Sequence, residues 1–345
     1  MEGSAFEFCT NIDYFQFLNA TPIPYESYML ANGKPVIVPT EAAVTDYKTK
    51  WGSIIPSRHS IIAAFDGQTV HVPTRGTLNS VLTELGVDKE TIAKLKLTGQ
   101  INKADFDVMK SKMPALTYLD LSEVMCEGNK IPDNAIGDNN PYNPNKKIKT
   151  IILPESITEI GGYAFRDCKG LTGSLTIPNS VTKIGESAFY ECTGFNGSLK
   201  ISNSVTKIGA SAFQNTGFTG SLTLPNSVTV IGSAAFRACS GFTGTLTIPN
   251  SLTQIGAEAF YECIGFNGTL TIPNSVTTII RNAFEGCTNI EAFKFLSTTP
   301  ITYNTEMLPD GKPVIVPTEA AVTAYTDTWG SSIIPDRHSI SAASE

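Results

Sequence analysis

A motif that recurs every 23 or 24 residues is the sequence feature that most constrains the fold of this chain. Each copy contains an Ala-Phe pair, and the phenylalanines of these pairs are Phe165, Phe189, Phe213, Phe236, Phe260 and Phe284. A fixed period of this length predicts a solenoid in which each repeat forms one coil. One coil has about six large apolar side chains, too few to offset its backbone entropy alone. The repeats must therefore stack and bury one another's apolar edges.

Two structural elements are expected within a repeat such as GSLTIPNSVTKIGESAFYECTGFN (173–196). The apolar residues of LTIP (175–178) alternate with a threonine, which predicts a short strand with one buried face that ends at the proline. The Ala, Phe and Cys of GESAFYEC (185–192) lie at helical spacing, which predicts a short helix. The predicted fold is therefore an α/β solenoid, a leucine-rich repeat array of ~24-residue rungs, each a short parallel strand plus a short helix, with caps at both ends.

The pattern L-T-I-P-N-S-V-T-x-I-G-x-x-A-F-x-x-C resembles the repeat of the BspA-like leucine-rich repeat family, over about residues 148–290. Proteins of that family are surface or secreted proteins of host-associated bacteria and some protists. They are implicated in attachment to host proteins such as fibronectin and fibrinogen and in adhesion between cells. The resemblance therefore implies an extracellular or cell-surface location and an adhesive role, but it assigns no contact residue.

A second repetition has a much longer period. Residues 5–61 match residues 283–340, and VIVPTEAAVT is identical in both copies. In the second copy we expect a short strand at Val314–Val316, a helical turn at Glu319–Tyr325, and Trp329 as a plug over the last rung. The segment is similar to the closing segment of BspA-like arrays. We therefore interpret both copies as C-terminal caps and expect the natural protein to continue upstream of the first.

This interpretation divides the chain into four parts. Residues 1–65 would be a partial last rung and the C-terminal cap of a preceding array, and residues 66–125 the N-terminal cap of a second array. Residues 126–290 would be that BspA-like array, and residues 291–345 its C-terminal cap. In the N-terminal cap, the patterns predict two amphipathic helices, at Thr77–Leu85 and at Ile101–Met113, the second capped by Asn102 and ended by Pro114.

Charge and hydropathy exclude several classes of partner. The net charge is -7 and no run of basic residues occurs, so a nucleic-acid partner is not expected. No apolar segment approaches the roughly 18 to 20 residues of a membrane-spanning helix, so membrane insertion is not expected either. This chain shows no secretory signal at its start.

No motif predicts catalysis, a cofactor or a metal site. Five of the seven cysteines recur at one rung position, one strand spacing of about 4.8 Å apart, which suits neither a disulfide nor a zinc site. We interpret them as small buried apolar residues. The rung containing QNTGF (214–218) is expected to lack this cysteine. GESAF and GASAF resemble a nucleophile elbow only weakly, and the Asp/Asn cluster at 133–140 lacks the spacing of a calcium loop.

The surface positions that vary from rung to rung are the candidates for ligand binding. We select five of them as a possible ligand-binding surface: Lys183, Tyr190, Lys207, Arg237 and Tyr261. The predicted function is a non-enzymatic recognition or adhesion module for an extracellular-matrix or host surface protein. One alternative is a carbohydrate-binding accessory module, with Tyr142, Tyr190 and Tyr261 as stacking platforms for a glycan. The other is a structural spacer without a ligand.

Overall fold

The chain divides into two compact units, residues 1–67 and 68–345. The computed structural model describes residues 15–16, 22, 36–38, 41–51, 61–63, 67–137, 147–304, 306–330 and 338–343. Four residues named in the sequence analysis lie outside the described residues: Tyr142, and Asp138, Asn139 and Asn140 of the Asp/Asn cluster. The described residues of the first unit form a three-stranded parallel sheet in the order β1-β2-β3 and the helix α1: β1 (Phe15–Gln16), β2 (Val36–Val38), α1 (Glu41–Trp51) and β3 (Ile61–Ala63).

The end of the second unit has the same order of elements: β18 (Ile290–Phe295), β19 (Val314–Val316), α5 (Glu319–Trp329) and β20 (Ile340–Ala342). The aromatic pair on the helix also has the same geometry in both units. Tyr47 and Trp51 meet edge to face at 5.1 Å, and Tyr325 and Trp329 at 5.2 Å. Trp329 is buried, as predicted for a plug, and its indole N–H donates to the Ile301 carbonyl.

The second unit begins with two strand–helix pairs followed by a third strand. These elements are β4 (Gln68–Val72), α3 (Leu78–Glu84), β5 (Lys94–Ile101), α4 (Lys103–Lys112) and β6 (Tyr118–Cys126). Both predicted helices are confirmed. Asn102 caps α4 by accepting from the Ala104 N–H, and the buried Asp105 carboxylate accepts from the backbone N–H groups of Asn102, Gly76 and Leu78. One carboxylate therefore fixes the starts of both helices.

Each coil of the array contributes to three sides. The first side begins at β8 (Thr150–Ile152), continues with the LTIP segments and ends at β16 (Gly268–Ile272). The LTIP segments pair in parallel, for example β10 (Leu175–Thr176) with β12 (Leu199–Lys200). The second side is a seven-stranded parallel sheet, which was not predicted. The chain enters its first strand after a 3₁₀ turn at Glu127–Asn129. The strands of this sheet are β7 (Lys130–Ile131), β9 (Glu159–Ile160), β11 (Lys183–Ile184), β13 (Lys207–Ile208), β14 (Val230–Ile231), β15 (Gln254–Ile255) and β17 (Thr278–Ile279).

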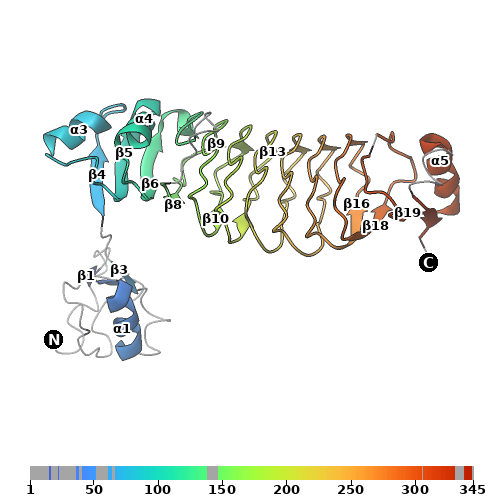
Figure 1. Cartoon of the computed structure of the whole chain (residues 1–345), viewed down its shortest axis with the longest axis horizontal. Coiled ribbons are helices and arrows are strands. Elements are labelled where there is room, and N and C mark those ends of the chain that lie inside the picture. The colour runs from blue at the N-terminus through green and yellow to red at the C-terminus, as the bar shows by residue number, and fades with distance from the viewer. Residues whose placement is uncertain are drawn as a thin grey trace, which may run out of the picture. The chain divides into compact units, whose positions relative to one another are not determined.

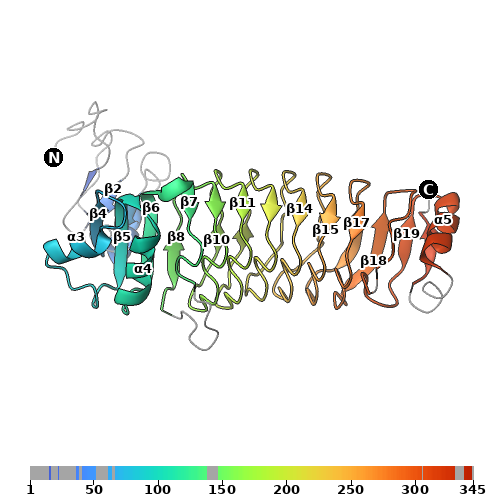
Figure 2. The same ribbon diagram turned by 90° about the horizontal axis from the view of Figure 1, so that it is seen from above.

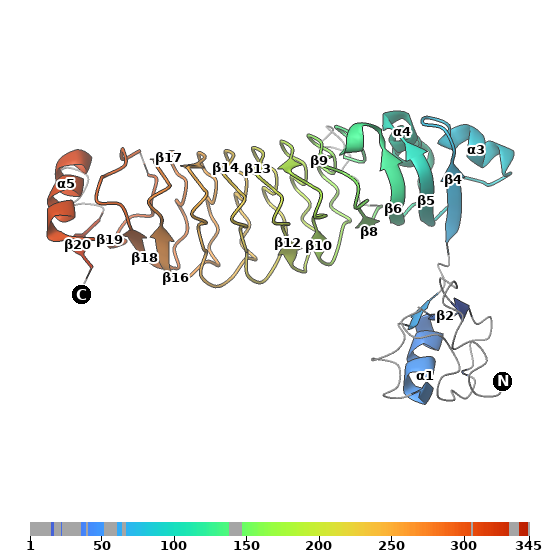
Figure 3. The same cartoon turned by 180° about the vertical axis from the view of Figure 1, so that it is seen from behind.

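The third side corrects the prediction of a short helix in every rung. In GESAFYEC (185–192), Ser187 and Glu191 have φ of 51° and 58°, in the left-handed region. Alternate N–H groups donate across to the next coil, as from Phe189 to the Ala212 carbonyl at 2.8 Å. A helix is about 10–12 Å wide, whereas neighbouring coils are about 4.8 Å apart. Turns direct the same side chains toward the core as a helix would, and they fit within the spacing between coils. The coils of this unit stack in a nearly straight row (Figures 1, 2 and 3).

The core is a set of side-chain columns that run from coil to coil. The Ala-Phe phenylalanines stack face to face at centroid distances of 5.2 to 5.4 Å, from Phe165 to Phe284. A second column of phenylalanines, from Phe195 to Phe266, meets the first edge to face. Stacked repeats with parallel strands are thus confirmed as the architecture of the array.

The left-handed residues of the turns make a testable prediction. We expect Ala238→Gly to stabilise the second unit by about 0.5 kcal/mol or more, because Ala238 has a φ of 56°. A side chain in that region costs about 1–2 kcal/mol, more than the ~0.4–1 kcal/mol that glycine loses through the unfolded state. Ala235→Gly, in the buried column of the same coil, should destabilise by about 1 kcal/mol. Thermal unfolding measured by circular dichroism checks both changes, and equal effects would contradict this account.

Candidate functional site

The seven-stranded sheet presents one outward side chain from each strand. In register these are Lys130, Glu159, Lys183, Lys207, Val230, Gln254 and Thr278. Glu159 lies 3.1 Å from the ammonium groups of both Lys130 and Lys183. Burial opposes its ionisation, but the hydrogen bonds from the two lysines outweigh burial and lower the pKa of Glu159. We call this row the sheet stripe; its first half is charged and its second half is neutral.

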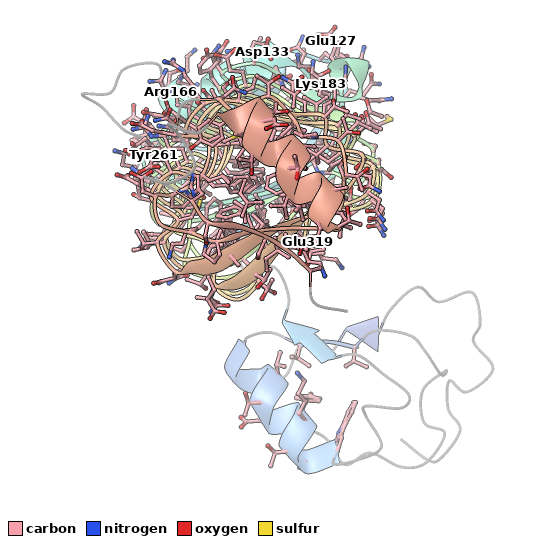
Figure 4. The ribbon with its side chains drawn as sticks, turned by 90° about the vertical axis from the view of Figure 1, so that its right-hand side faces the viewer. Glu127, Asp133, Arg166, Lys183, Tyr261 and Glu319 are labelled. Atoms are coloured by element: carbon pink, nitrogen blue, oxygen red, sulfur yellow. The ribbon has the colours of Figure 1, made fainter. Side chains whose placement is uncertain are left out.

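The turn side presents aromatic and guanidinium groups that stack between coils. Arg166 lies over the ring of Tyr190 in the next coil, at 5.0 Å from its centroid. Arg237 lies over Tyr261 in the same way, at 4.8 Å, and also forms a 2.7 Å ion pair with Glu258. Seen along the array, Arg166 and Tyr261 lie on one side and Lys183 on the adjacent side (Figure 4).

We call the turn-side row the ridge; it comprises Tyr163, Arg166, Tyr190, Glu191, Arg237, Glu258, Tyr261 and Glu262. The arginine of one coil covers one ring face of the tyrosine in the next. On the other side, the backbone of Glu191 bonds to Gln214 in the following coil and that of Glu262 to Glu285. The guanidinium leaves at most one face of each ring open, and each tyrosine is half-buried. An aromatic platform for a sugar needs an open ring face, so this arrangement does not favour the glycan alternative.

The five predicted surface residues do not form one cluster. Lys183 and Lys207 belong to the sheet stripe, and Tyr190, Arg237 and Tyr261 belong to the ridge. Sequence reasoning missed Arg166, which stacks on Tyr190. The sequence does contain a signal for this pair, because Arg166 and Tyr190 both recur 71 residues later, as Arg237 and Tyr261.

The recurring cysteines are buried and act as hydrogen-bond donors between coils. The thiols of Cys192, Cys239, Cys263 and Cys287 each donate to a phenylalanine carbonyl of the preceding coil at 3.0 Å. The rung predicted to lack the cysteine carries Thr216 in its place, and the Thr216 hydroxyl donates to the Phe213 carbonyl at 2.9 Å. The prediction of a buried structural role for these cysteines is confirmed.

Other candidate chemical groups have structural partners. His338 is buried between Tyr303 and the Lys312 carbonyl, and Asp133 accepts from Gly162 and pairs with Lys130. Within the described ranges, no group of three or more His, Cys, Asp or Glu side chains could hold a metal ion. An open groove of about 200 Å³ near Thr247 is lined by Thr, Leu, Ile, Asn and Pro, so it offers no acid–base group.

A family model decides the identity of the array. The model described as the BspA type leucine-rich repeat region matches residues 134–264 and 206–306, with six copies. The chain belongs to this family. No curated protein sequence matches the chain. None of the helices that the structure describes is long and apolar enough to cross a membrane.

Several solved structures are similar to the chain. A leucine-rich repeat protein of T. pallidum is 26% identical over 54% of this chain and 81% of its own, with a TM-score of 0.37. A leucine-rich cell surface protein of Faecalibacterium prausnitzii is 18% identical over 83% and 88%, with a TM-score of 0.30. A leucine-rich repeat protein of Bacteroides ovatus is 17% identical over 75% and 86%, with a TM-score of 0.29.

Burial of the thiols predicts that they resist alkylation in the folded protein. Burial raises the pKa of Cys239 to about 11 and that of Cys287 to about 12, and it also raises the pKa values of Cys168, Cys192 and Cys263. At pH 8 we expect iodoacetamide to leave these five cysteines unmodified until urea unfolds the chain. Peptide mass spectrometry gives the result for each site. Rapid native labelling of Cys239 would contradict the burial seen here.

The same shifts predict a loss of stability at alkaline pH. The unfolded thiol ionises near its ordinary pKa of 9.0, whereas folded Cys239 stays neutral to about pH 11. The stabilising effect is therefore complete below pH 9 and falls as the pH rises toward 11. Between pH 8 and pH 10 this thiol should account for about 1 kcal/mol of lost unfolding free energy. Urea unfolding of Cys239→Ala should show a correspondingly smaller loss than the unmodified chain.

Proposed function

We propose that the second unit is a non-enzymatic recognition module that binds a macromolecule outside the cell, in particular an extracellular-matrix or host surface protein. The observation that carries the proposal is the ridge, a partly exposed row of arginine, tyrosine and glutamate side chains on a repetitive scaffold. Arginine and tyrosine are enriched among the residues that dominate protein–protein binding energy. Membership of the BspA-type family supports a location at the cell surface or in the secreted fraction.

The architecture supports a binding role in a second way. Each coil contacts only its neighbours, so the array presents outward positions that packing does not constrain. Loss of a side chain at these positions leaves the buried columns intact. A surface of this kind can be altered for a partner without loss of the fold.

A parallel binding screen tests the function. The purified chain is passed over immobilised fibronectin, fibrinogen and a glycan array, with serum albumin as the control surface. We expect saturable binding to at least one matrix protein and none to albumin. Saturable binding to glycans alone would favour the carbohydrate-binding alternative, and the absence of saturable binding on every surface would favour a structural spacer.

A further inference from the structure

The array contains a repetition longer than the single coil. FRDCKGLTGSLTIPNSVTKIGESAFYECTGFNGSL (165–199) matches FRACSGFTGTLTIPNSLTQIGAEAFYECIGFNGTL (236–270). The matching segments cover about one and a half coils and begin three coils apart, so equivalent residues are 71 positions apart. We call the three coils from each of these starting points a module. Buried positions repeat in every coil because packing requires it. Outward positions have no such requirement, so they show which surface the two modules retain.

The two outward rows differ in what the modules retain. Within the matching segments the sheet stripe has one equivalent pair, Lys183 and Gln254, and its residues differ. The stripe pairs on either side of the segments, Glu159 with Val230 and Lys207 with Thr278, differ as well. On the ridge, two equivalent pairs differ, Tyr163 with Ala234 and Ser187 with Glu258, but three are identical: Arg166 and Arg237, Tyr190 and Tyr261, Glu191 and Glu262. We call Arg166, Tyr190 and Glu191 the first trio, and Arg237, Tyr261 and Glu262 the second trio.

The two trios also have the same geometry. The arginine lies over the tyrosine ring of the next coil at 5.0 Å in the first trio and 4.8 Å in the second. The glutamate N–H donates to the following coil at 2.9 and 2.8 Å. Three coils at about 4.8 Å each place the trios about 14 Å apart on one side of the array.

Folding stability does not account for the retained glutamate. In the first trio, Glu191 forms an ion pair with Lys169 at 3.2 Å and accepts from the Asn215 side chain at 2.8 Å. The residues equivalent to these two partners are Ser240 and Gly286 in the second module. Glu262 has therefore been kept although both partners were replaced, and its side chain is exposed. Retention without a structural partner is typical of a residue that contacts another molecule.

We propose that the ridge is the contact face of the array and that the two trios are equivalent sites for one protein partner. This inference rests on the proposed recognition function and adds the face, the residues and a valency of two. A protein fits better than a glycan, because each tyrosine is half-buried and one face of its ring lies under a guanidinium. The exposed carboxylate of Glu262 favours a partner with a basic side chain at that point. Two linked contacts raise the avidity well above that of either site.

Paired substitutions in the full chain test the proposal on whichever of fibronectin or fibrinogen binds in the screen. The variants are Arg166→Ala with Tyr190→Ala, Arg237→Ala with Tyr261→Ala, and all four together. We expect each pair to weaken binding at least about tenfold and the fourfold variant to weaken it more than either pair. Lys183→Ala with Lys207→Ala, on the sheet stripe, is the matched control and should bind within about twofold of the unmodified chain.

A single substitution separates contact from folding. Glu262→Gln should weaken binding while the melting temperature stays within about 2 °C, because no hydrogen bond or ion pair of its carboxylate occurs among the described residues. Binding lost only in the lysine control would overturn the ridge as the contact face and leave the recognition function standing. Binding lost after enzymatic deglycosylation of the immobilised protein would overturn the protein partner. If the unmodified chain binds neither protein, the recognition function itself fails with the proposal.

Discussion

The spacing between neighbouring coils is the constraint on which the rest of this structure depends. Each coil has to hydrogen-bond and pack against the next at about one strand spacing, on all of its sides at once. Two sides meet this requirement with short parallel strands. The third meets it with turns whose alternate N–H groups donate to the next coil. Inside, the stacked phenylalanines keep the same interval, at 5.2 to 5.4 Å.

This constraint also decides where function can lie. Every inward position is fixed by its column, including the cysteines, whose thiols bond to the preceding coil. Only outward positions remain for recognition, and they form rows because the coils are in register. The sheet stripe and the ridge are two such rows on adjacent sides of the array (Figure 4). Three equivalent pairs are identical on the ridge and none on the sheet stripe, which is why we propose the ridge as the face that contacts a partner.

Local signals were sufficient for the two helices that precede the array and for much of the core. Asn102 and Pro114 bound α4 because helix capping acts within a few residues of the helix end. The burial of Trp329 was expected from its place beyond the last rung. The candidate site was harder to predict from local signals. Lys183 and Tyr190 are seven residues apart in the sequence but lie in different rows, because the chain turns between two sides of the coil.

The sequence by itself determined the period, the stacking of repeats, the two copies of the closing segment and the burial of the cysteines, because each follows from a pattern within one repeat or from recurrence. Tertiary structure decided the rest. The spacing of Ala188, Phe189 and Cys192 fits a helix as well as turns, and only the next coil, about 24 residues away, selects turns by accepting their N–H groups. The seven-stranded sheet and the stack of Arg166 on Tyr190 likewise exist only between coils. Contacts between residues so distant along the chain have no local pattern from which to predict them.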